Sequence, residues 1–317
     1  MTARVSNAAI ELLVGWLGER YFRTFRREPA AETRFDALLS QREHRIGVTV
    51  GTLWDGGLVS GAEEWEALLA SELEGEPGGR ALWVPPGAAL PDHEPRRSEL
   101  RLLLSNGMRG LEPGARREVR IPVTAGLARV GDEGAYMSVV GGLATEWTTL
   151  SEGINGAFHL DSRELRRLPE QRAEVEILVS RVRDHAAALA SNEVTPIQLH
   201  DYWVVSRLPA DEPPGVTVIG APPDFDPQDG AVARRLLRRH VTRAVEQRQA
   251  ASEAGEQTSL AVLVLVAALA HLQDEMATPA LRGMNPAAYG ALDLIALVAD
   301  GAVRQVLQPR SLPWEQR

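Results

Sequence analysis

The segment that most constrains the fold is Leu260–Val266, an unbroken apolar run that follows a long stretch of helical periodicity. A continuous apolar run of this length is typical of a strand that is buried on both faces. A strand of that kind needs a cover on each side, and the helix expected over 229–248 can supply one of them. We therefore expect an α/β fold with a mixed central sheet flanked by helices.

Hydrophobic periodicity predicts the other elements around this strand. Apolar residues at three- and four-residue spacing indicate an amphipathic helix over 6–27, and two apolar runs joined by a polar turn indicate strands at 34–39 and 44–54. Two β-hairpins are expected as elaborations, because alternating or apolar segments flank glycine-containing turns. Their strands are 118–124 with 136–140, and 292–298 with 302–307.

The domain organisation follows from the absence of a recognisable linker. No Pro-, Gly- or Ser-rich boundary separates two halves of the 317 residues, so we expect a single compact unit over 1–317. The stretch 75–160 is rich in loops and turns and is typical of an elaboration on a central sheet.

Composition excludes several classes of chemistry. The chain has no cysteine, and its basic residues are all arginine, which removes thiolate nucleophiles, cysteine-held metals and every lysine-dependent mechanism. The histidines lack the spacing of a zinc site, so no metal is expected on them. The formal net charge of −9 argues against general electrostatic binding of nucleic acid, although a local basic face remains compatible with it.

No targeting segment is evident, and the expected location is the cytoplasm. The N-terminus lacks a basic region followed by an apolar run. The longest apolar stretch, 260–272, falls short of the roughly 20 residues that a membrane span needs. We expect no membrane association.

One resemblance is carried by the opening of the chain. A predicted helix precedes the strand 34–39, which contains Asp36, and the segment 47–55 follows with the sequence Gly-Val-Thr-Val-Gly-Thr-Leu-Trp-Asp. This arrangement resembles the PD-(D/E)XK, or restriction-endonuclease-like, nuclease superfamily. The resemblance implies a nuclease-like core of 1–60 with 200–317, elaborated by 61–199. In the family, an aspartate, a glutamate and a lysine on adjacent strands converge on Mg²⁺ and a water that hydrolyses a phosphodiester.

This chain departs from the family pattern at two catalytic positions. Thr49 stands in the glutamate position and Gly51 in the lysine position, while Asp36 is retained. The helix offers Glu11 and Glu19 as further acidic side chains. The resemblance thus marks Glu19, Asp36 and Thr49 as vestigial site residues and implies that catalysis and its metal are lost.

Three functions follow from these observations. The first is a catalytically degenerate nuclease-like protein that acts by binding, in a DNA-related or defence-related process or as a subunit of an enzyme complex. The second is an active nuclease whose acidic site has migrated to Glu19 and Asp36, and this alternative alone requires Mg²⁺. The third is a scaffold or assembly protein that binds a protein partner or a second copy of itself, without nucleic acid.

An arginine-rich stripe on the predicted helix 229–248 is the candidate nucleic-acid surface. Its residues recur every four positions, and arginine forks suit phosphate. The same pattern is common on a solvated helix face that is paired with carboxylates. The candidate residues are Arg234, Arg235, Arg238 and Arg239, with Arg243 continuing the row.

Overall fold

The computed structural model describes residues 2–29, 33–209, 213–226, 229–268, 277–281 and 283–315. The chain divides into two compact units, Met1–Arg117 with Val204–Arg317, and Glu118–Trp203. This division differs from the single unit predicted over 1–317. The sequence shows no linker because the chain passes between the units twice within continuous strands, β5 (Arg116–Gly131) and β8 (Val194–Arg207).

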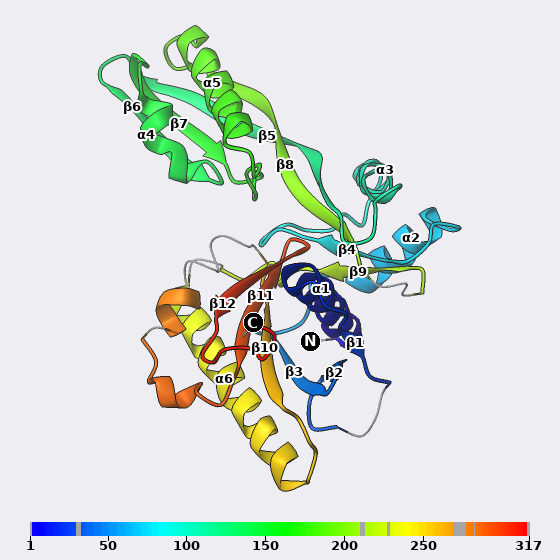
Figure 1. Ribbon diagram of the computed structural model, residues 1–317. Coiled ribbons are helices and arrows are strands. Elements are labelled where there is room, and N and C mark those ends of the chain that lie inside the picture. Colours follow the sequence, from blue (N-terminus) through cyan, green and yellow to red (C-terminus); the bar gives the residue numbers. More distant parts are fainter. Residues whose placement is uncertain are drawn as a thin grey trace. The chain divides into compact units, whose positions relative to one another are not determined.

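The first unit is built on a mixed six-stranded sheet (Figure 1), in which β3, β10 and β11 are parallel and the outer pairings are antiparallel. In spatial order its strands are β1 (Arg26–Arg27), β2 (Ala37–Gln41), β3 (His44–Thr52), β10 (Leu260–Val266), β11 (Leu294–Ala299) and β12 (Ala302–Leu307). The sequence predicted the hairpin of β2 with β3, the buried strand and the closing hairpin, and all three are present.

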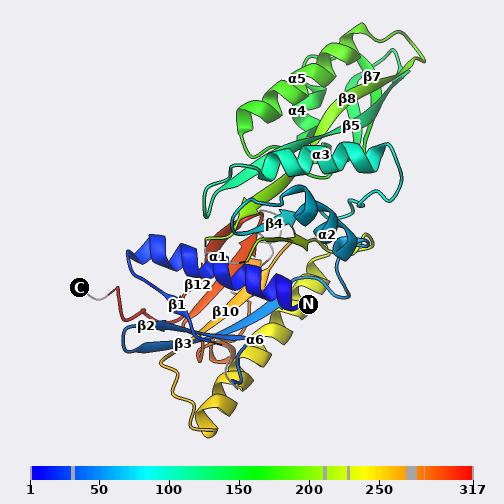
Figure 2. The ribbon, with the colours of Figure 1, turned by 90° about the vertical axis from the view of Figure 1, so that its right-hand side faces the viewer.

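Two helices cover this sheet on opposite faces (Figure 2). Val48 and Val50 pack with the apolar side of α1 (Ala3–Tyr21), whereas Leu263 and Leu265 pack with α6 (Gly230–Glu253). The successive side chains of a strand point to opposite faces, so both helices are needed to bury β10. The α/β class and the mixed sheet flanked by helices are therefore confirmed.

Helix α1 is shorter at its C-terminal end than the predicted 6–27. It ends at Tyr21, where Phe22 takes a left-handed conformation with φ 53°. Arg26 then pairs with Ser40 in a short strand beside β2. The apolar spacing had included Phe25, which is buried against the same core from outside the helix. Burial of Phe25 thus explains why the apolar spacing in the sequence continues past the end of the helix.

The first unit also contains a smaller group of strands and helices. Arg80 in β4 (Gly79–Trp83) pairs with Arg207 in the final part of β8, and β4 runs parallel to β9 (Gly215–Ile219). The helices of this region are α2 (Ala62–Glu72) and α3 (Arg96–Met108), and a 3₁₀ turn, η2 (Pro286–Ala288), precedes β11. Within the described ranges, no helix is both long enough and apolar enough to cross a membrane.

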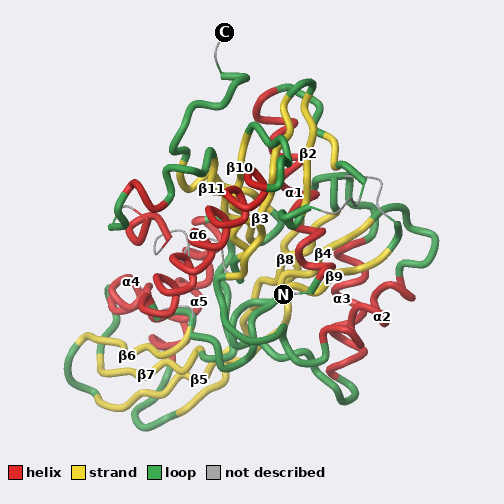
Figure 3. Tube along the Cα trace, turned by 90° about the horizontal axis from the view of Figure 1, so that it is seen from below, coloured by secondary structure: helices red, strands yellow, loops and turns green. Residues whose placement is uncertain are grey.

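The second unit packs α4 (Trp147–Ser151) and α5 (Arg172–Ala188) on one side of β5, β6 (Ala135–Gly141), β7 (Gly156–Ser162) and the start of β8. A 3₁₀ turn, η1 (Ala144–Glu146), precedes α4. Figure 3 shows β6, β7 and β5 side by side. The second sheet has the order β6-β7-β5-β8-β4-β9.

The predicted hairpin of 118–124 with 136–140 is wrong. β6 pairs in parallel with β7, and β7 pairs antiparallel with β5, so β7 lies between the two predicted partners. The inward side chains Met137 of β6 and Phe158 and Leu160 of β7 are all almost completely buried, so both strands contribute to the core of this unit. The prediction failed because η1 and α4 lie between β6 and β7, and a helical crossover of this kind allows consecutive strands to pair in parallel, so β6 joins β7 rather than β5.

Candidate functional site

Asp36, just before β2, and Thr49 in β3 lie next to each other. Ala37 is opposite Val48 in the β2–β3 pairing, so Asp36, one residue earlier, is level with Thr49. The Asp36 amide donates to the Val48 carbonyl oxygen over 2.9 Å. Because Val48 and Val50 face α1, Thr49 and Gly51 face α6. Helix α6 therefore covers Thr49 and Gly51.

Asp36 is bound by an arginine of α6. Arg243 Nη2 donates to both carboxylate oxygens of Asp36, over 2.7 and 2.9 Å. The same carboxylate accepts the Val50 amide over 2.7 Å, and Arg243 Nη1 donates to the Val50 carbonyl oxygen over 3.2 Å. The backbone of Val50 would otherwise lack a partner at this edge, since β2 has not yet begun. The pair therefore completes the sheet edge, and an arginine balances the charge of Asp36.

Side chains of α6 also occupy the space around Thr49 and Gly51, which stand at the glutamate and lysine positions of the resemblance. Thr49 is 1% exposed, and its hydroxyl donates to Gln247 Oε1 over 2.6 Å. A Cβ on Gly51 would lie 2.3 Å from Nδ1 of His240, closer than atoms can approach. A lysine therefore cannot stand at position 51 unless His240 moves. We call Asp36, Thr49, His240, Arg243 and Gln247 the α6 polar cluster.

His240 is a neutral packing residue of this cluster. It is 6% exposed, and its Nε2 donates to the Thr52 carbonyl oxygen over 2.8 Å. Burial lowers the pKa of His240, and the positive charges of Arg239 and Arg243 lower it further, against the opposing effect of the Thr52 bond. Within the described residues Nδ1 has no hydrogen-bond partner, which fits an unprotonated nitrogen packed against Gly51.

A hollow of about 260 Å³ lies beside the cluster, at the end of β3. Its charged lining residues are Asp55, Arg239 and Arg243. Arg239 donates to Asp55 over 3.1 Å, and Arg235 also pairs with this carboxylate. Burial raises the pKa of Asp55, but the hydrogen bonds from Arg235 and Arg239 outweigh it and lower the pKa overall. Much of the hollow's charge is therefore internally neutralised.

The acidic residues of α1 do not join Asp36. Glu19 is exposed near the end of α1, and the buried Glu11 lies 3.6 Å from Arg27 in an ion pair. Because α1 and α6 cover opposite faces of the sheet, both glutamates are separated from the α6 polar cluster by the sheet. Across the described part of the chain, no group of three histidine or carboxylate side chains could hold a metal ion.

The arginine stripe on α6 is divided into two kinds of residue. Arg235 and Arg239 are paired with Asp55, and Arg243 belongs to the α6 polar cluster. Arg234 and Arg238 are exposed, and the described residues provide neither with an ion pair. Asp55 is distant in sequence from α6, so the sequence pattern alone could not reveal this neutralisation.

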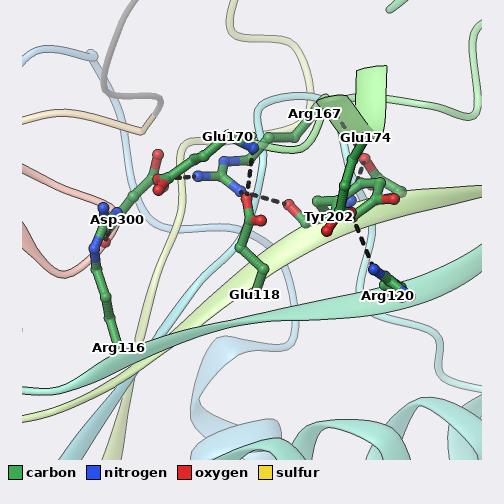
Figure 4. A network of polar contacts seen from close by, with 9 residues as sticks. Arg116, Glu118, Arg120, Arg167, Glu170, Glu174, Tyr202 and Asp300 are labelled. Carbon is green, nitrogen blue, oxygen red and sulfur yellow. Dashed lines mark hydrogen bonds and ion pairs between the residues drawn. The ribbon is translucent and has the colours of Figure 1, made fainter. Parts of the chain in front are cut away.

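The second unit holds a separate polar network around Arg167 (Figure 4), whose carboxylate partners the sequence did not indicate. The buried Arg167 donates to Glu118 over 2.7 Å, to Glu170 over 2.9 Å and to the Tyr202 carbonyl oxygen over 3.3 Å. Asp201, also buried, accepts the amides of Arg167 and Arg166 and the indole N–H of Trp203. Burial raises the pKa of Asp201, and these bonds oppose that rise. The network consists of structural pairings and leaves Arg167 inside the unit.

Comparisons of the chain with protein-family models, with curated proteins and with solved structures each found no match. The functional argument therefore depends on the geometry of the α6 polar cluster and of the charged surfaces around it.

The close approach at Gly51 predicts a clash that depends on His240. We expect Gly51→Ala to lower the free energy of unfolding by about 1–3 kcal/mol, because the new methyl group overpacks against the ring. Gly57→Ala is the matched control, since a Cβ there meets nothing within 4 Å, and it should change stability by less than about 0.5 kcal/mol. Urea unfolding measures both. Equal effects of the two substitutions would contradict the proposed packing.

The lowered pKa of His240 predicts a dependence of stability on pH. The unfolded state binds a proton near pH 6.5, whereas the folded state resists protonation until a lower pH. The stabilisation is therefore complete above about pH 6.5 and is lost as the pH falls toward the folded pKa. His240→Gln should reduce the slope of unfolding free energy between about pH 7 and 5.5. His93→Gln should retain the slope, because that side chain is 89% exposed.

Proposed function

We propose that this chain is a catalytically degenerate protein of restriction-endonuclease-like fold that acts by binding. The observation that carries the proposal is the α6 polar cluster. Asp36 lies level with Thr49, as the resemblance requires, and α6 fills the space around both with Arg243, Gln247 and His240.

The order of elements supports the same proposal. A helix precedes the antiparallel pair β2–β3, and the long helix α6 leads into β10, which is parallel to β3. The closing hairpin β11–β12 then extends the sheet. This succession matches the nuclease-like core that the resemblance implies for 1–60 with 200–317.

The chemistry of the cluster does not favour cleavage. Mg²⁺ requires near-octahedral oxygen ligation, and Asp36 is the cluster's one carboxylate. That carboxylate is already held by Arg243, while a hydroxyl stands at the position of the second acidic ligand. The active-nuclease alternative needs Glu19 beside Asp36, and α1 lies on the other face of the sheet. The scaffold alternative stays open as an outcome of the binding test.

Binding of nucleic acid is assigned to the exposed part of the stripe, Arg234 and Arg238. Arginine binds phosphate in a bidentate manner, and these two side chains need not leave a carboxylate to do so. The remainder of the protein is acidic overall, so contact is expected to be local and dependent on ionic strength. A cytoplasmic, DNA-related or defence-related role, alone or beside an active enzyme, belongs to this proposal.

The first test is a cleavage assay. Purified protein with Mg²⁺ or Mn²⁺ should leave plasmid and oligonucleotide DNA intact, because the cluster lacks a second carboxylate and a lysine. Asp36→Asn is included because asparagine retains an acceptor for the Val50 amide. Metal-dependent cutting by the wild type that disappears in Asp36→Asn would overturn the proposal in favour of the active nuclease.

The second test measures binding of short duplex DNA as the salt concentration is raised. Arg234→Gln with Arg238→Gln should weaken binding and flatten the salt dependence. Each lost phosphate contact reduces the number of counterions that binding releases from the DNA. Arg34→Gln with Arg96→Gln is a charge-matched control at two exposed positions of the same unit. Folding should persist in both variants, since exposed charges contribute about 0–1 kcal/mol each. If the wild-type protein does not bind DNA at low salt, the result would favour the scaffold alternative, in which nucleic acid is not a ligand.

A further inference from the structure

A second charged hollow lies at the other end of β2 and β3 from the α6 polar cluster. It has a volume of about 440 Å³ and forms where the end of α1, the strand β1 and the β2–β3 turn meet. Its lining residues are Phe22, Arg23, Thr24, Arg26, Ser40, Gln41 and Arg42. We call this feature the arginine hollow. The pairing of Arg26 with Ser40 holds two of its sides together.

The arginine hollow concentrates positive charge without a carboxylate in its lining. Ser40 Oγ donates to the backbone carbonyl oxygen of Arg26, but among the described residues none forms an ion pair or hydrogen bond with the guanidinium groups of Arg23, Arg26 or Arg42. Neighbouring arginines differ in this respect, because Arg27 pairs with Glu11 and Arg45 with Glu28. In a chain of formal charge −9, three arginines in one hollow make a local field that attracts anions.

The backbone around the hollow presents an aromatic ring to solvent. Phe22 and Arg42 both have left-handed backbone conformations, with φ of 53° and 52°, which are uncommon for residues other than glycine. Phe22 is 92% exposed, the highest value among the exposed large apolar side chains of the described chain. No packing within the described chain accounts for a phenylalanine held in water at the rim of a cationic hollow.

We propose that the arginine hollow binds a nucleotide, with the phosphates on Arg23, Arg26 and Arg42 and the base stacked on Phe22. Arginine forks match phosphate oxygens in geometry and charge. An aromatic side chain beside a cationic groove is the arrangement that stacks bases without reading their sequence. Ser40, Thr24 and Gln41 add neutral hydrogen-bonding groups to the lining. The volume falls within the roughly 300–1,000 Å³ of small-ligand sites.

This site goes beyond the proposed function, because it shares no residue with the α6 polar cluster or with Arg234 and Arg238. The same ligand chemistry has two sources, a free mononucleotide or the end of a single strand. The test therefore uses ATP, a five-nucleotide single strand and inorganic tripolyphosphate as separate probes at low salt. Affinity is measured by calorimetry, and circular dichroism checks the fold of each variant.

Wild-type protein should bind ATP or the single strand more tightly than tripolyphosphate. Arg23→Gln with Arg26→Gln and Arg42→Gln should weaken binding of every probe. Phe22→Ala should weaken nucleotide binding by about tenfold and leave tripolyphosphate binding unchanged, because only the base stacks. Tighter binding of the single strand than of ATP identifies the ligand as the end of a nucleic-acid strand. Equal affinity for ATP and the strand identifies it as a free nucleotide.

Two matched controls separate this site from general electrostatics. Arg34→Gln with Arg96→Gln and Arg181→Gln removes the same charge at exposed positions elsewhere and should leave binding intact. Arg234→Gln with Arg238→Gln should leave ATP binding intact, which separates this result from the test of the proposed function with duplex DNA. The proposal is overturned by absence of binding for all probes, by equal loss in the control variants, or by nucleotide binding that Phe22→Ala does not change.

Discussion

The burial of β10 on both faces is the constraint on which the first unit depends. Each residue of this strand is at most 5% exposed, and it pairs in parallel with β3 on one side and β11 on the other. An apolar strand in that position requires two covering layers, which α1 and α6 supply. Once α6 is held there, its polar side reaches the edge of β3, and this contact decides the chemistry of the candidate site.

The α6 polar cluster has a structural purpose that is independent of catalysis. Asp36 and Arg243 together satisfy the amide and carbonyl of Val50, where β2 has not yet begun. Leaving such groups buried without partners costs about 1–3 kcal/mol each, which is enough to retain both side chains. An aspartate at this position can therefore have a structural role without a metal.

Arginine has two different roles in this chain, in keeping with the complete absence of lysine. Arg167, Arg235, Arg239 and Arg243 are held by carboxylates, and Arg167 is buried in the second unit. The arginines of the hollow beside Phe22 have no such partner in the described chain. The planar guanidinium suits both settings, because its geometry allows bidentate pairs with carboxylates and with phosphates.

The sequence by itself determined the α/β class, the buried strand 260–266 and the β2–β3 hairpin, because these follow from local periodicity and short turns, whereas the adjacency of Asp36 and Thr49 was implied only by the resemblance. Only the tertiary structure decided that β7 separates β6 from β5, that Asp55 neutralises half of the arginine stripe, and that His240 occupies the space beside Gly51. These outcomes depend on contacts between residues far apart in the chain, where burial and charge pairing outweigh local preference. Periodicity reports which face of an element is buried, but not which partner buries it.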